Sequence, residues 1–432
     1  MRSFSPRRTR RSTGTLRTTV THVLGATVAV AGLAAAAPAA QAAPGTTYYV
    51  APTGTDTAAG TAAAPLKTVN AALKLARDGE RVQLAPGAYA AVRDENVRTR
   101  TVEVAGAGPA QTQVAGLDVF GGQGLTFSGI RFTGQVRLNG HPVKHAAQPA
   151  KAITITGSEI VTTNSCLTIK EGSEDITLSN SRLTGCYAGV AGPGNPYVSK
   201  RITITGNTIE KSTSDGIQFG AWDDVTITDN VIRDTVDPAN TIHNDAIQLT
   251  GTSTGVHIER NQLLNSRNQL ILIQDAIGPL DDVTVANNLL AGAGSVALQS
   301  QGATRARIVN NTIWNAKDGG LWLRKGYLRG GAYVVPTDTV MTNNLTTTIK
   351  VMDGAVASTN AGNVMPCPSK TSGIIVPAGT SCVADPGFVN AAAGDYRLLP
   401  GSAVRSLGSP LGLPPTDLTG ALRTVPVPGA YT

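Results

Sequence analysis

Two short phrases of the same residue types are the strongest candidates for chemistry in this sequence. One runs from Asp215 to Gln218 and the other from Asp245 to Gln248, both with the pattern D-x-I-Q, and His243 stands two residues before the second. Two adjacent carboxylates can share a proton, because like charges raise one pKa, or share a calcium ion, which prefers oxygen ligands. A histidine serves as a general base when its pKa lies near the working pH. The alternative is structural: each aspartate caps its turn by bonding backbone amides, and each glutamine is solvated.

A second group of polar residues occupies comparable positions in neighbouring segments. Lys170 is a second candidate base, and the candidate substrate contacts are Gln218, Gln248, Gln274, Gln299, Trp322, Arg324 and Lys325. Arginine and lysine suit a carboxylated sugar, and tryptophan can stack on a pyranose ring. Taken singly, each of these residue types is more often ordinary surface, but their shared column favours a role in binding. Of the other histidines after residue 42, His141 and His145 lie in a loop insertion and His257 replaces an outward threonine.

The elements that position these residues repeat along the chain. A unit of alternating apolar and polar residues recurs with a minimum period of 23 residues, which is typical of a strand with one buried face. The units begin at Leu125, Ile153, Ile176, Ile202, Val225, Val256, Val283, Ala306 and Thr339. Six units end in an asparagine: Asn207, Asn230, Asn261, Asn288, Asn311 and Asn344. Asparagine can bond the backbone of a bend and tolerates left-handed φ, and stacked amides can bond one another.

Two further strands complete most units. One follows at Leu167, Gly216, Ala246, Val296 and Leu321, and a short apolar pair lies between, at Ile160, Leu183, Ile209, Ile232, Leu263 and Ile313. Three short strands per coil predict an all-β fold, a parallel β-helix of about ten coils. A β-propeller is the competing fold, but its repeats run about 40 residues with four strands each. In a β-helix Ile217 points inward, so Gln218 and Gln248 point outward, about 4.8 Å apart.

Both ends of such a stack need covering, because open sheet edges invite aggregation. Residues 68–77 are the best helix signal, with Thr68 as N-cap and Asp78-Gly79 as the stop, and we place this helix over the N-terminal end. The Pro- and Gly-rich tail, 366–432, is expected to cover the other end. The expected organisation is therefore a leader (1–42), an N-terminal strand with its capping helix (43–100), coils (101–365) and the tail.

Residues 1–42 are typical of a secretory signal: an arginine-rich start, an alanine-rich apolar run and a small-x-small site before Ala43. A membrane anchor is the alternative, but the run is short for a span of about 20 residues. Paired arginines leave the export route open between the general and twin-arginine pathways. The segment carries six of the 36 basic residues and no acid, so 30 basic residues remain against 29 acids. That balance argues against a nucleic-acid partner.

Four cysteines lie in the exported part, and an even count in an oxidising compartment favours two disulfides. Cys166 and Cys186 are 20 residues apart, and Cys367 and Cys382 are 15 apart. Zinc ligation and buried free thiols are the alternatives, but there is no CxxC pair. The apolar content of 41% argues against disorder, and the abundance of Gly, Thr and Asn argues against a helical bundle.

The two ends of the mature chain resemble a known family. The segments 48–56, 60–68 and 79–89 resemble the opening of secreted right-handed parallel β-helix proteins, which include pectate lyases and related polysaccharide lyases. Asp385 to Phe388, Asp395 to Leu398 and Pro400 to Ser402 resemble their closing segment. The resemblance implies a right-handed helix and a substrate lying along the sheet that contains Gln218. These motifs are structural, and fold alone does not give function.

Three functions follow from the candidate residues and this resemblance. The first is a secreted, monomeric polysaccharide lyase acting on an acidic polysaccharide, with His243 or Lys170 as the base. The sugar carboxylate would be neutralised either by calcium bound to Asp215 and Asp245 or by the amides of Gln218 and Gln248. An epimerase would use the same residues. The second is a glycoside hydrolase using the two aspartates, although the Gly-His-Gly and Arg-x-Lys motifs of polygalacturonases are absent. The third is a non-catalytic polysaccharide-binding or surface protein.

Overall fold

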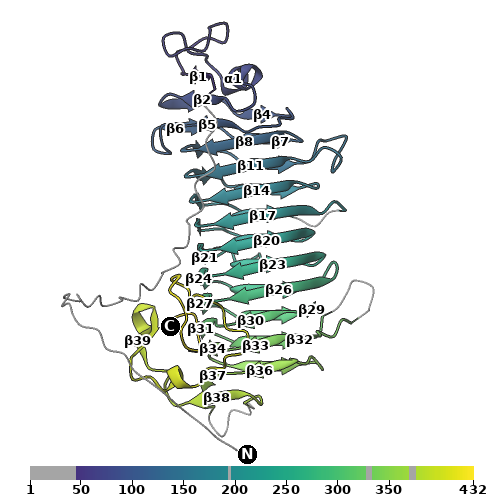
Figure 1. The fold of residues 1–432 in the computed structure, drawn as a ribbon, viewed down its shortest axis with the longest axis vertical. Coiled ribbons are helices and arrows are strands. Elements are labelled where there is room, and N and C mark those ends of the chain that lie inside the picture. Colours follow the sequence, from purple (N-terminus) through teal and green to yellow (C-terminus); the bar gives the residue numbers. More distant parts are fainter. Residues whose placement is uncertain (1–44, 193–195, 327–332, 369–375) are drawn as a thin grey trace, which may run out of the picture. The chain divides into compact units, whose positions relative to one another are not determined.

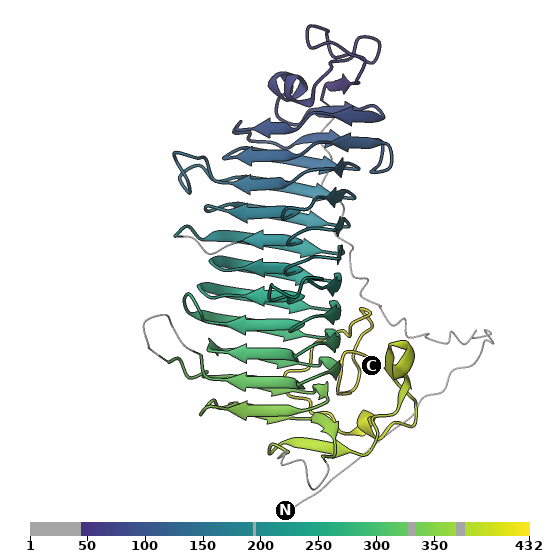
Figure 2. The ribbon, with the colours of Figure 1, turned by 180° about the vertical axis from the view of Figure 1, so that it is seen from behind.

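The alternating units form a right-handed parallel β-helix in the computed structural model, which describes residues 45–192, 196–326, 333–368 and 376–432. Its strands lie in three parallel sheets of 14, 13 and 11 strands, called here sheets A, B and C in the order in which each coil visits them. Eleven coils of the described residues contribute to all three sheets, close to the ten expected, and they stack one above another in Figures 1 and 2. A propeller is excluded, because each unit pairs with its neighbours rather than forming a separate blade.

Sheet A comprises β1 (Thr47–Val50), β2 (Arg81–Leu84), β5 (Val102–Ala105), β8 (Gln123–Ser128), β11 (Lys151–Thr156), β14 (Glu174–Ser179), β17 (Ser199–Thr205), β20 (Trp222–Thr228), β23 (Ser253–Glu259), β26 (Leu280–Ala286), β29 (Ala303–Thr304), β30 (Arg307–Val309), β33 (Val340–Thr342) and β36 (Thr359–Ala361). Sheet B comprises β3 (Gly87–Tyr89), β6 (Thr112–Val114), β9 (Arg131–Phe132), β12 (Glu159–Val161), β15 (Arg182–Thr184), β18 (Thr208–Glu210), β21 (Val231–Thr235), β24 (Gln262–Ser266), β27 (Leu289–Ala293), β31 (Thr312–Ala316), β34 (Leu345–Thr346), β37 (Asn363–Pro366) and β38 (Thr380–Val383). Sheet C comprises β4 (Val92–Asp94), β7 (Leu117–Phe120), β10 (Val136–Asn139), β13 (Leu167–Lys170), β16 (Val190–Gly192), β19 (Ile217–Phe219), β22 (Ile247–Leu249), β25 (Ile271–Gln274), β28 (Val296–Gln301), β32 (Gly319–Arg324) and β35 (Ile349–Met352).

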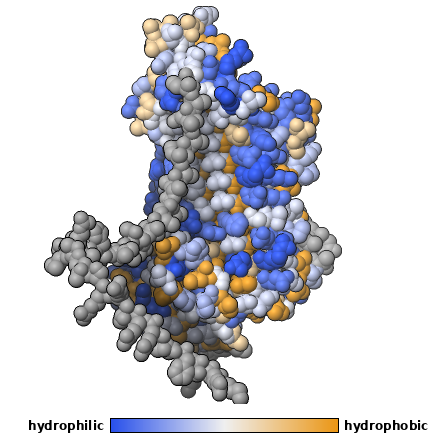
Figure 3. Space-filling model, in the orientation of Figure 1, coloured by the Kyte–Doolittle hydropathy of each residue, from blue (hydrophilic) through white to orange (hydrophobic). Residues whose placement is uncertain are grey.

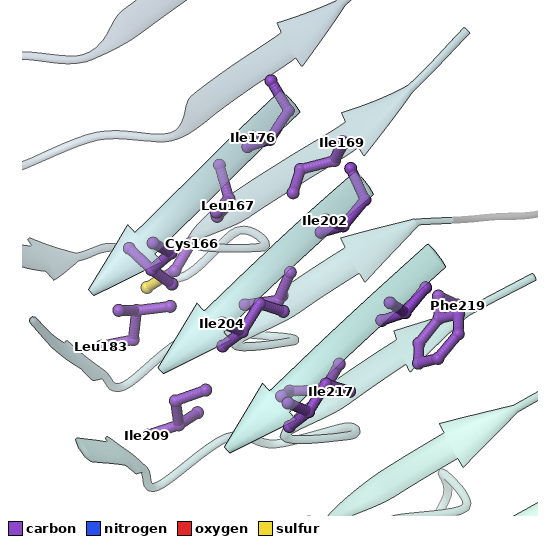
Figure 4. Packing of buried hydrophobic residues seen from close by; sticks show 14 of the residues in the cluster. Cys166, Leu167, Ile169, Ile176, Leu183, Ile202, Ile204, Ile209, Ile217 and Phe219 are labelled. Carbon is purple, nitrogen blue, oxygen red and sulfur yellow. The ribbon is translucent and has the colours of Figure 1, made fainter. Parts of the chain in front are cut away.

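The core is a continuous stack of aliphatic side chains inside the coils. Register pairs Ile153 with Ile176 and Ile176 with Ile202, and all three side chains are buried. Figure 4 shows the same inward packing from sheets A and C. Because each coil leaves its apolar edges open until the next coil covers them, burial is shared only between neighbours. The outward threonines of sheet A are half-buried, and Figure 3 shows that face mostly pale, with hydrophilic residues gathered on its right-hand margin.

A ladder of buried asparagine amides runs through the turn between sheets A and B. Within the ladder, an asparagine Oδ1 accepts two hydrogen bonds from the asparagine one coil earlier, one from its backbone N–H and one from its side-chain amide. Asn261 Oδ1, for example, accepts both from Asn230, each at 3.0 Å. The ladder contains Asn207, Asn230, Asn261, Asn288, Asn311, Asn344 and also Asn363. The expected amide stacking is confirmed, but the expected left-handed φ falls on the preceding residue, such as Asp229 (59°) or Arg260 (53°). The ladder asparagine instead keeps ordinary φ and turns its amide inward.

Helix α1 (Val69–Leu75) begins at Thr68, whose side chain accepts the N–H of Ala71. It ends at Ala76 rather than at Asp78-Gly79, because Ala76 adopts an extended conformation. Figure 1 places α1 beside β1 and β2, at the start of the stack. The tail begins with β38, which extends sheet B, and continues through the antiparallel pair β39 (Phe388–Asn390) and β40 (Asp395–Leu398) and the short 3₁₀ helices η1 (Ala391–Ala393) and η2 (Ala403–Ser406).

The tail does more than cover an end, because it also packs along the flank of the coils. The left-handed residues Asn287, Asn310 and Asn343 donate hydrogen bonds from their side-chain amides to three backbone carbonyls of the tail, those of Thr416, Val427 and Ser409.

Both expected disulfides are present, Cys166–Cys186 and Cys367–Cys382, so zinc ligation and free thiols are excluded for these cysteines. The expected leader, 1–42, lies outside the described residues. Within the described part of the chain, no helix has the length and apolar character that crossing a membrane requires.

Candidate functional site

Sheet C brings the two D-x-I-Q phrases side by side. Strand β19 pairs with β22 so that Gln218 lies opposite Gln248, and Gln218 Nε2 donates to Gln248 Oε1 at 2.6 Å. The aspartate of each phrase precedes its strand by two residues, at the turn from sheet B. There the backbone N–H of Asp245 donates to Asp215 Oδ1 at 2.7 Å, which fixes one carboxylate against the next coil. Asp215 therefore accepts a backbone N–H, as the structural alternative above expected, but that N–H belongs to the following coil and not to its own turn.

Asp215, His243 and Asp245, called here the His243 cluster, offer ligand atoms that all lie within 4.8 Å of one another. His243 Nδ1 lies 3.3 Å from Asp245 Oδ2. The other oxygen, Asp245 Oδ1, accepts the backbone N–H of Gln269 at 2.8 Å. The histidine side chain is 47% exposed whereas that of Asp245 is fully buried. The arrangement is a half-exposed histidine whose Nδ1 lies beside a buried carboxylate, a pairing that can orient a general base.

A long turn between β21 and β22 carries His243, and its polar residues hold it in one shape. The Asp237 carboxylate accepts the N–H groups of Ala239, Thr241 and Ile242 at 2.9, 2.6 and 3.0 Å. These bonds, the one from Thr241 first, lower the pKa of Asp237 and keep it ionised. Asn244 donates to the carbonyls of Thr213 and Ser214 in the previous coil. The residues on either side of His243 are thereby anchored to the stack.

Burial and mutual repulsion set the protonation of the His243 cluster. Burial, reinforced by the negative charge of Asp245, raises the pKa of Asp215 to about 7. Burial also raises the pKa of Asp245. The contact with Asp245 raises the pKa of His243 above its ordinary value of 6.5, and the Gln269 side chain adds to this rise. Near neutral pH the group can therefore exchange a proton, the property expected of a reactive site.

Replacing Asp215 with asparagine should change the pH dependence of stability. In the folded protein the pKa of this carboxyl is about 7, whereas its ordinary value in an unfolded chain is 3.8. Its contribution to stability is therefore lost as the pH rises from about 4 to about 7. The difference corresponds to roughly 4 kcal/mol. We expect Asp215→Asn to gain stability relative to the parent between about pH 4 and about pH 8 in urea titrations. A constant difference across that range would contradict the raised pKa.

The remaining predicted contacts lie along the outer face of sheet C, but at different distances from the cluster. Register aligns Gln218, Gln248, Leu272, Gln299, Trp322 and Lys350 in one column, called here the outer strip. Gln248 and Gln299 point outward as expected yet keep only 8% exposure, so neighbours largely cover them. Lys350 Nζ lies 4.7 Å from the Trp322 ring centroid. The strip therefore ends in an aromatic ring and a cation.

Lys170, Gln274 and Arg324 are the last residues of their strands, and Lys325 follows Arg324. Lys170 ends β13, two strands before β19, whereas Asp215 precedes the start of β19. Strand and sheet spacings place it well over 10 Å from the His243 cluster, so it cannot exchange a proton with that cluster directly. Arg324 is paired with Asp353 at 2.9 Å, and Lys325 lies over the Tyr333 ring at 4.4 Å. The structure thus groups these residues on one margin of sheet C, apart from the cluster.

The cluster suits an imidazole-binding metal better than calcium. Calcium takes six to eight oxygen ligands. Here the two carboxylates are buried, one oxygen of each already accepts a backbone N–H, and the third member supplies nitrogen. Histidine with carboxylates is a donor set for zinc, manganese or iron. The residues therefore fit the expected calcium poorly.

Gln269, Asn244 and Lys350 were missed by the sequence reasoning. Gln269 takes the place of the aspartate in the next coil, because Ala246 N–H donates to its carbonyl as Gly216 N–H does to that of Asp245. Aligning the segment before Ile271 with the two D-x-I-Q phrases would have found it. Asn244 and Lys350 gave no signal, since their roles depend on contacts between coils.

The sequence matches the family model for the right-handed β-helix region over residues 143–313 and 220–365, together more than half of the chain. The chain belongs to the right-handed β-helix family. No curated protein matches the sequence of this β-helix protein.

Solved structures share the fold of this β-helix protein at low identity. The complex of XylC with xylose is 13% identical, with 74% of this chain and 78% of that chain covered and a TM-score of 0.51. Pectate lyase Pel9A is 15% identical, with 90% and 96% covered and a TM-score of 0.48. The A-module of the Azotobacter vinelandii mannuronan C-5 epimerase AlgE6 is 17% identical, with 73% and 92% covered and a TM-score of 0.43. At these identities the similarity concerns the fold alone.

Proposed function

We propose that this protein is a secreted, monomeric polysaccharide lyase that cleaves a uronic-acid polymer by β-elimination, with His243 as the base. The observation that carries the proposal is the half-exposed His243 set against the buried Asp245 at 3.3 Å. Nδ1 faces the carboxylate, which leaves Nε2 to take a proton from the sugar. Asp245 and Asp215 act as positioning residues, because neither side chain reaches solvent.

In the proposed step neutral His243 removes the proton beside the sugar carboxylate, the new double bond forms as the bond to the glycosidic oxygen breaks, and that oxygen takes up a proton from water. The carboxylate must be neutralised for that proton to become acidic. The amides of Gln218 and Gln248, which lie on the two strands that follow the aspartates of the cluster, are the candidates for this role. Elimination needs one base and no second ionised carboxylate at the reacting carbon, which agrees with the burial of both aspartates.

A glycoside hydrolase is the weaker alternative. Inverting enzymes hold two carboxyl groups about 6.5–9.5 Å apart to admit a water molecule. The ligand atoms of Asp215 and Asp245 lie within 4.8 Å, and these residues are 2% and 0% exposed. A carboxylate that cannot touch the sugar can neither protonate the leaving oxygen nor attack the ring. The geometry therefore disfavours the aspartates as the hydrolytic pair.

The deciding experiment measures ultraviolet absorbance of the unsaturated uronate product. The mature protein is incubated with polygalacturonate, alginate, glucuronan and glycosaminoglycans, each with calcium and with chelator. A rise on one polymer is expected and names the substrate, and it should persist in chelator because the cluster fits calcium poorly. No rise on any polymer would contradict the lyase proposal, and reducing-sugar release would then separate a hydrolase from a binding protein.

The proposal predicts a specific pH profile for Asp245→Asn. The parent's kcat/KM should rise with pH as His243 loses its proton, at a pKa held above 6.5 chiefly by Asp245. Without the carboxylate the histidine releases its proton at lower pH, so the rising part of the kcat/KM profile should shift to lower pH. kcat at the plateau should also fall, because the imidazole loses its orienting partner. A limb that stays in place would contradict the assignment of His243 as the titrating base.

A further inference from the structure

A pocket of about 440 Å³ opens on the sheet B side of the turn that carries His243. Its volume lies in the range of small-ligand sites. Val236, at the start of that turn, forms one wall, and residues 265–267, 292–294 and 315–317 from the next three coils form the rest. No acidic residue lines it, whereas Arg267 and Lys317 both do.

Two glycines create the hollow between these cations. Arg267 follows β24 and Lys317 follows β31; the strand between them, β27, contains Gly292 and is followed by Gly294. A Cβ at Gly294 would lie 2.0 Å from the Arg267 carbonyl oxygen, and Gly292 has a φ of +84°. Of the lining residues in the coil between the two cations, only Ala293 has a side chain, which is a single methyl group. Asn265 and Asn315 also line the pocket.

The two cations lack acidic partners within the described ranges. Neither has a carboxylate oxygen within 4.0 Å among those residues, although most other arginines of the coils do. The Arg267 guanidinium donates to the Asp237 backbone carbonyl at 3.4 Å and not to its carboxylate. Two positive charges facing an acid-free hollow favour an anionic ligand, and guanidinium groups match carboxylates in geometry.

The pocket continues the path of a substrate past His243. The three coils that form most of the pocket lie one, two and three strands beyond the coil of His243, at the same edge of sheet C. This corresponds to roughly 5–15 Å along the stack. We propose that this pocket is a subsite that binds a uronate carboxylate of an acidic saccharide between Arg267 and Lys317, an inference that rests on the proposed function. It would hold a sugar beyond the reacting one and thereby select acidic polymers.

Binding to an inactive variant tests the subsite separately from catalysis. Titration calorimetry of His243→Ala would use hexasaccharides of galacturonate, mannuronate and glucuronate, with xylohexaose as the neutral probe. Adding Lys317→Gln, at a position three coils beyond the His243 turn, should weaken binding of one acidic probe about tenfold and flatten its salt dependence. Arg267→Gln should weaken it similarly. Lys67→Gln, which removes an exposed lysine at the N-terminal end, is the matched control and should bind like the parent.

The outcomes separate the subsite from the lyase proposal. Unchanged affinity in both pocket variants, no binding of any acidic probe, or an equal loss with xylohexaose would overturn the subsite. If the pocket variants bind acidic hexasaccharides more weakly but the parent forms no ultraviolet-absorbing product on any polymer, the subsite is supported and the lyase proposal is rejected. In an active protein, KM should rise for Lys317→Gln while kcat stays within twofold; a fall in kcat alone would overturn the inference.

Discussion

Replacing His243 with alanine is expected to lower kcat for elimination by about 10²–10⁴-fold, the contribution of a positioned general base. The loss should fall on kcat rather than KM, because the proton is transferred only in the transition state. Far-ultraviolet circular dichroism and the unfolding midpoint should be unchanged, since the side chain is half-exposed and lies on a turn held by Asp237 and Asn244. The measurement is the rate of product absorbance on the polymer identified with the parent.

His257→Ala provides a closely matched control. His257 Nδ1 also lies 3.3 Å from a carboxylate two residues later, Glu259, and its side chain is 48% exposed. It differs in lying on sheet A, in a column with Thr226 and Thr284, and its carboxylate is partly exposed. Activity of this variant should match the parent. An equal loss of activity in His243→Ala and His257→Ala would show that the effect is not specific to His243 and would reject His243 as the base.

The second large effect concerns stability. Asn261→Ala should reduce the free energy of unfolding by about 3–5 kcal/mol, because several buried polar groups lose their partners at once. The Asn230 N–H and amide lose their shared acceptor, and the Ile227 carbonyl loses a donor at 2.8 Å. Denaturant unfolding followed by fluorescence and circular dichroism measures the loss. Asn164→Ala, on an exposed turn, should change stability by less than about 0.5 kcal/mol.

An intermediate variant tests the cause of that loss. Serine occupies the ladder position in two earlier coils, where Ser181 Oγ accepts the Ser158 N–H at 3.1 Å and donates to the Ser179 carbonyl. Asn261→Ser should therefore retain one acceptor and be less destabilising than Asn261→Ala. If both variants unfold together, the loss comes from packing volume and not from the hydrogen bonds. A loss under 1 kcal/mol for alanine would show that the ladder contributes little.

The sequence alone determined the architecture. A period of two within units repeating every 23 residues or more forces strands whose apolar faces can be covered only by neighbouring coils, so the β-helix and the inward direction of Ile217 followed directly. Both disulfides were also predictable, because the count is even and the four cysteines fall into two pairs that are close in sequence, 20 and 15 residues apart. The asparagine column showed that amides would stack. It did not show which residue would take the left-handed φ, since the side-chain pattern does not distinguish adjacent turn positions.

Only the tertiary structure decided the candidate site and its surroundings. Alternation ends where a strand ends, so the directions of Asp215 and Asp245 were open, and the fold turned both carboxylates inward and left His243 facing solvent. The exposure of the outer strip depends on neighbouring side chains, which is why Gln248 is nearly covered. The acid-free pocket arises because Gly292 and Gly294 lie between Arg267 and Lys317 in three successive coils. Residues about 25 apart in sequence become neighbours through coil stacking, and the lengths of the intervening turns set which of them meet.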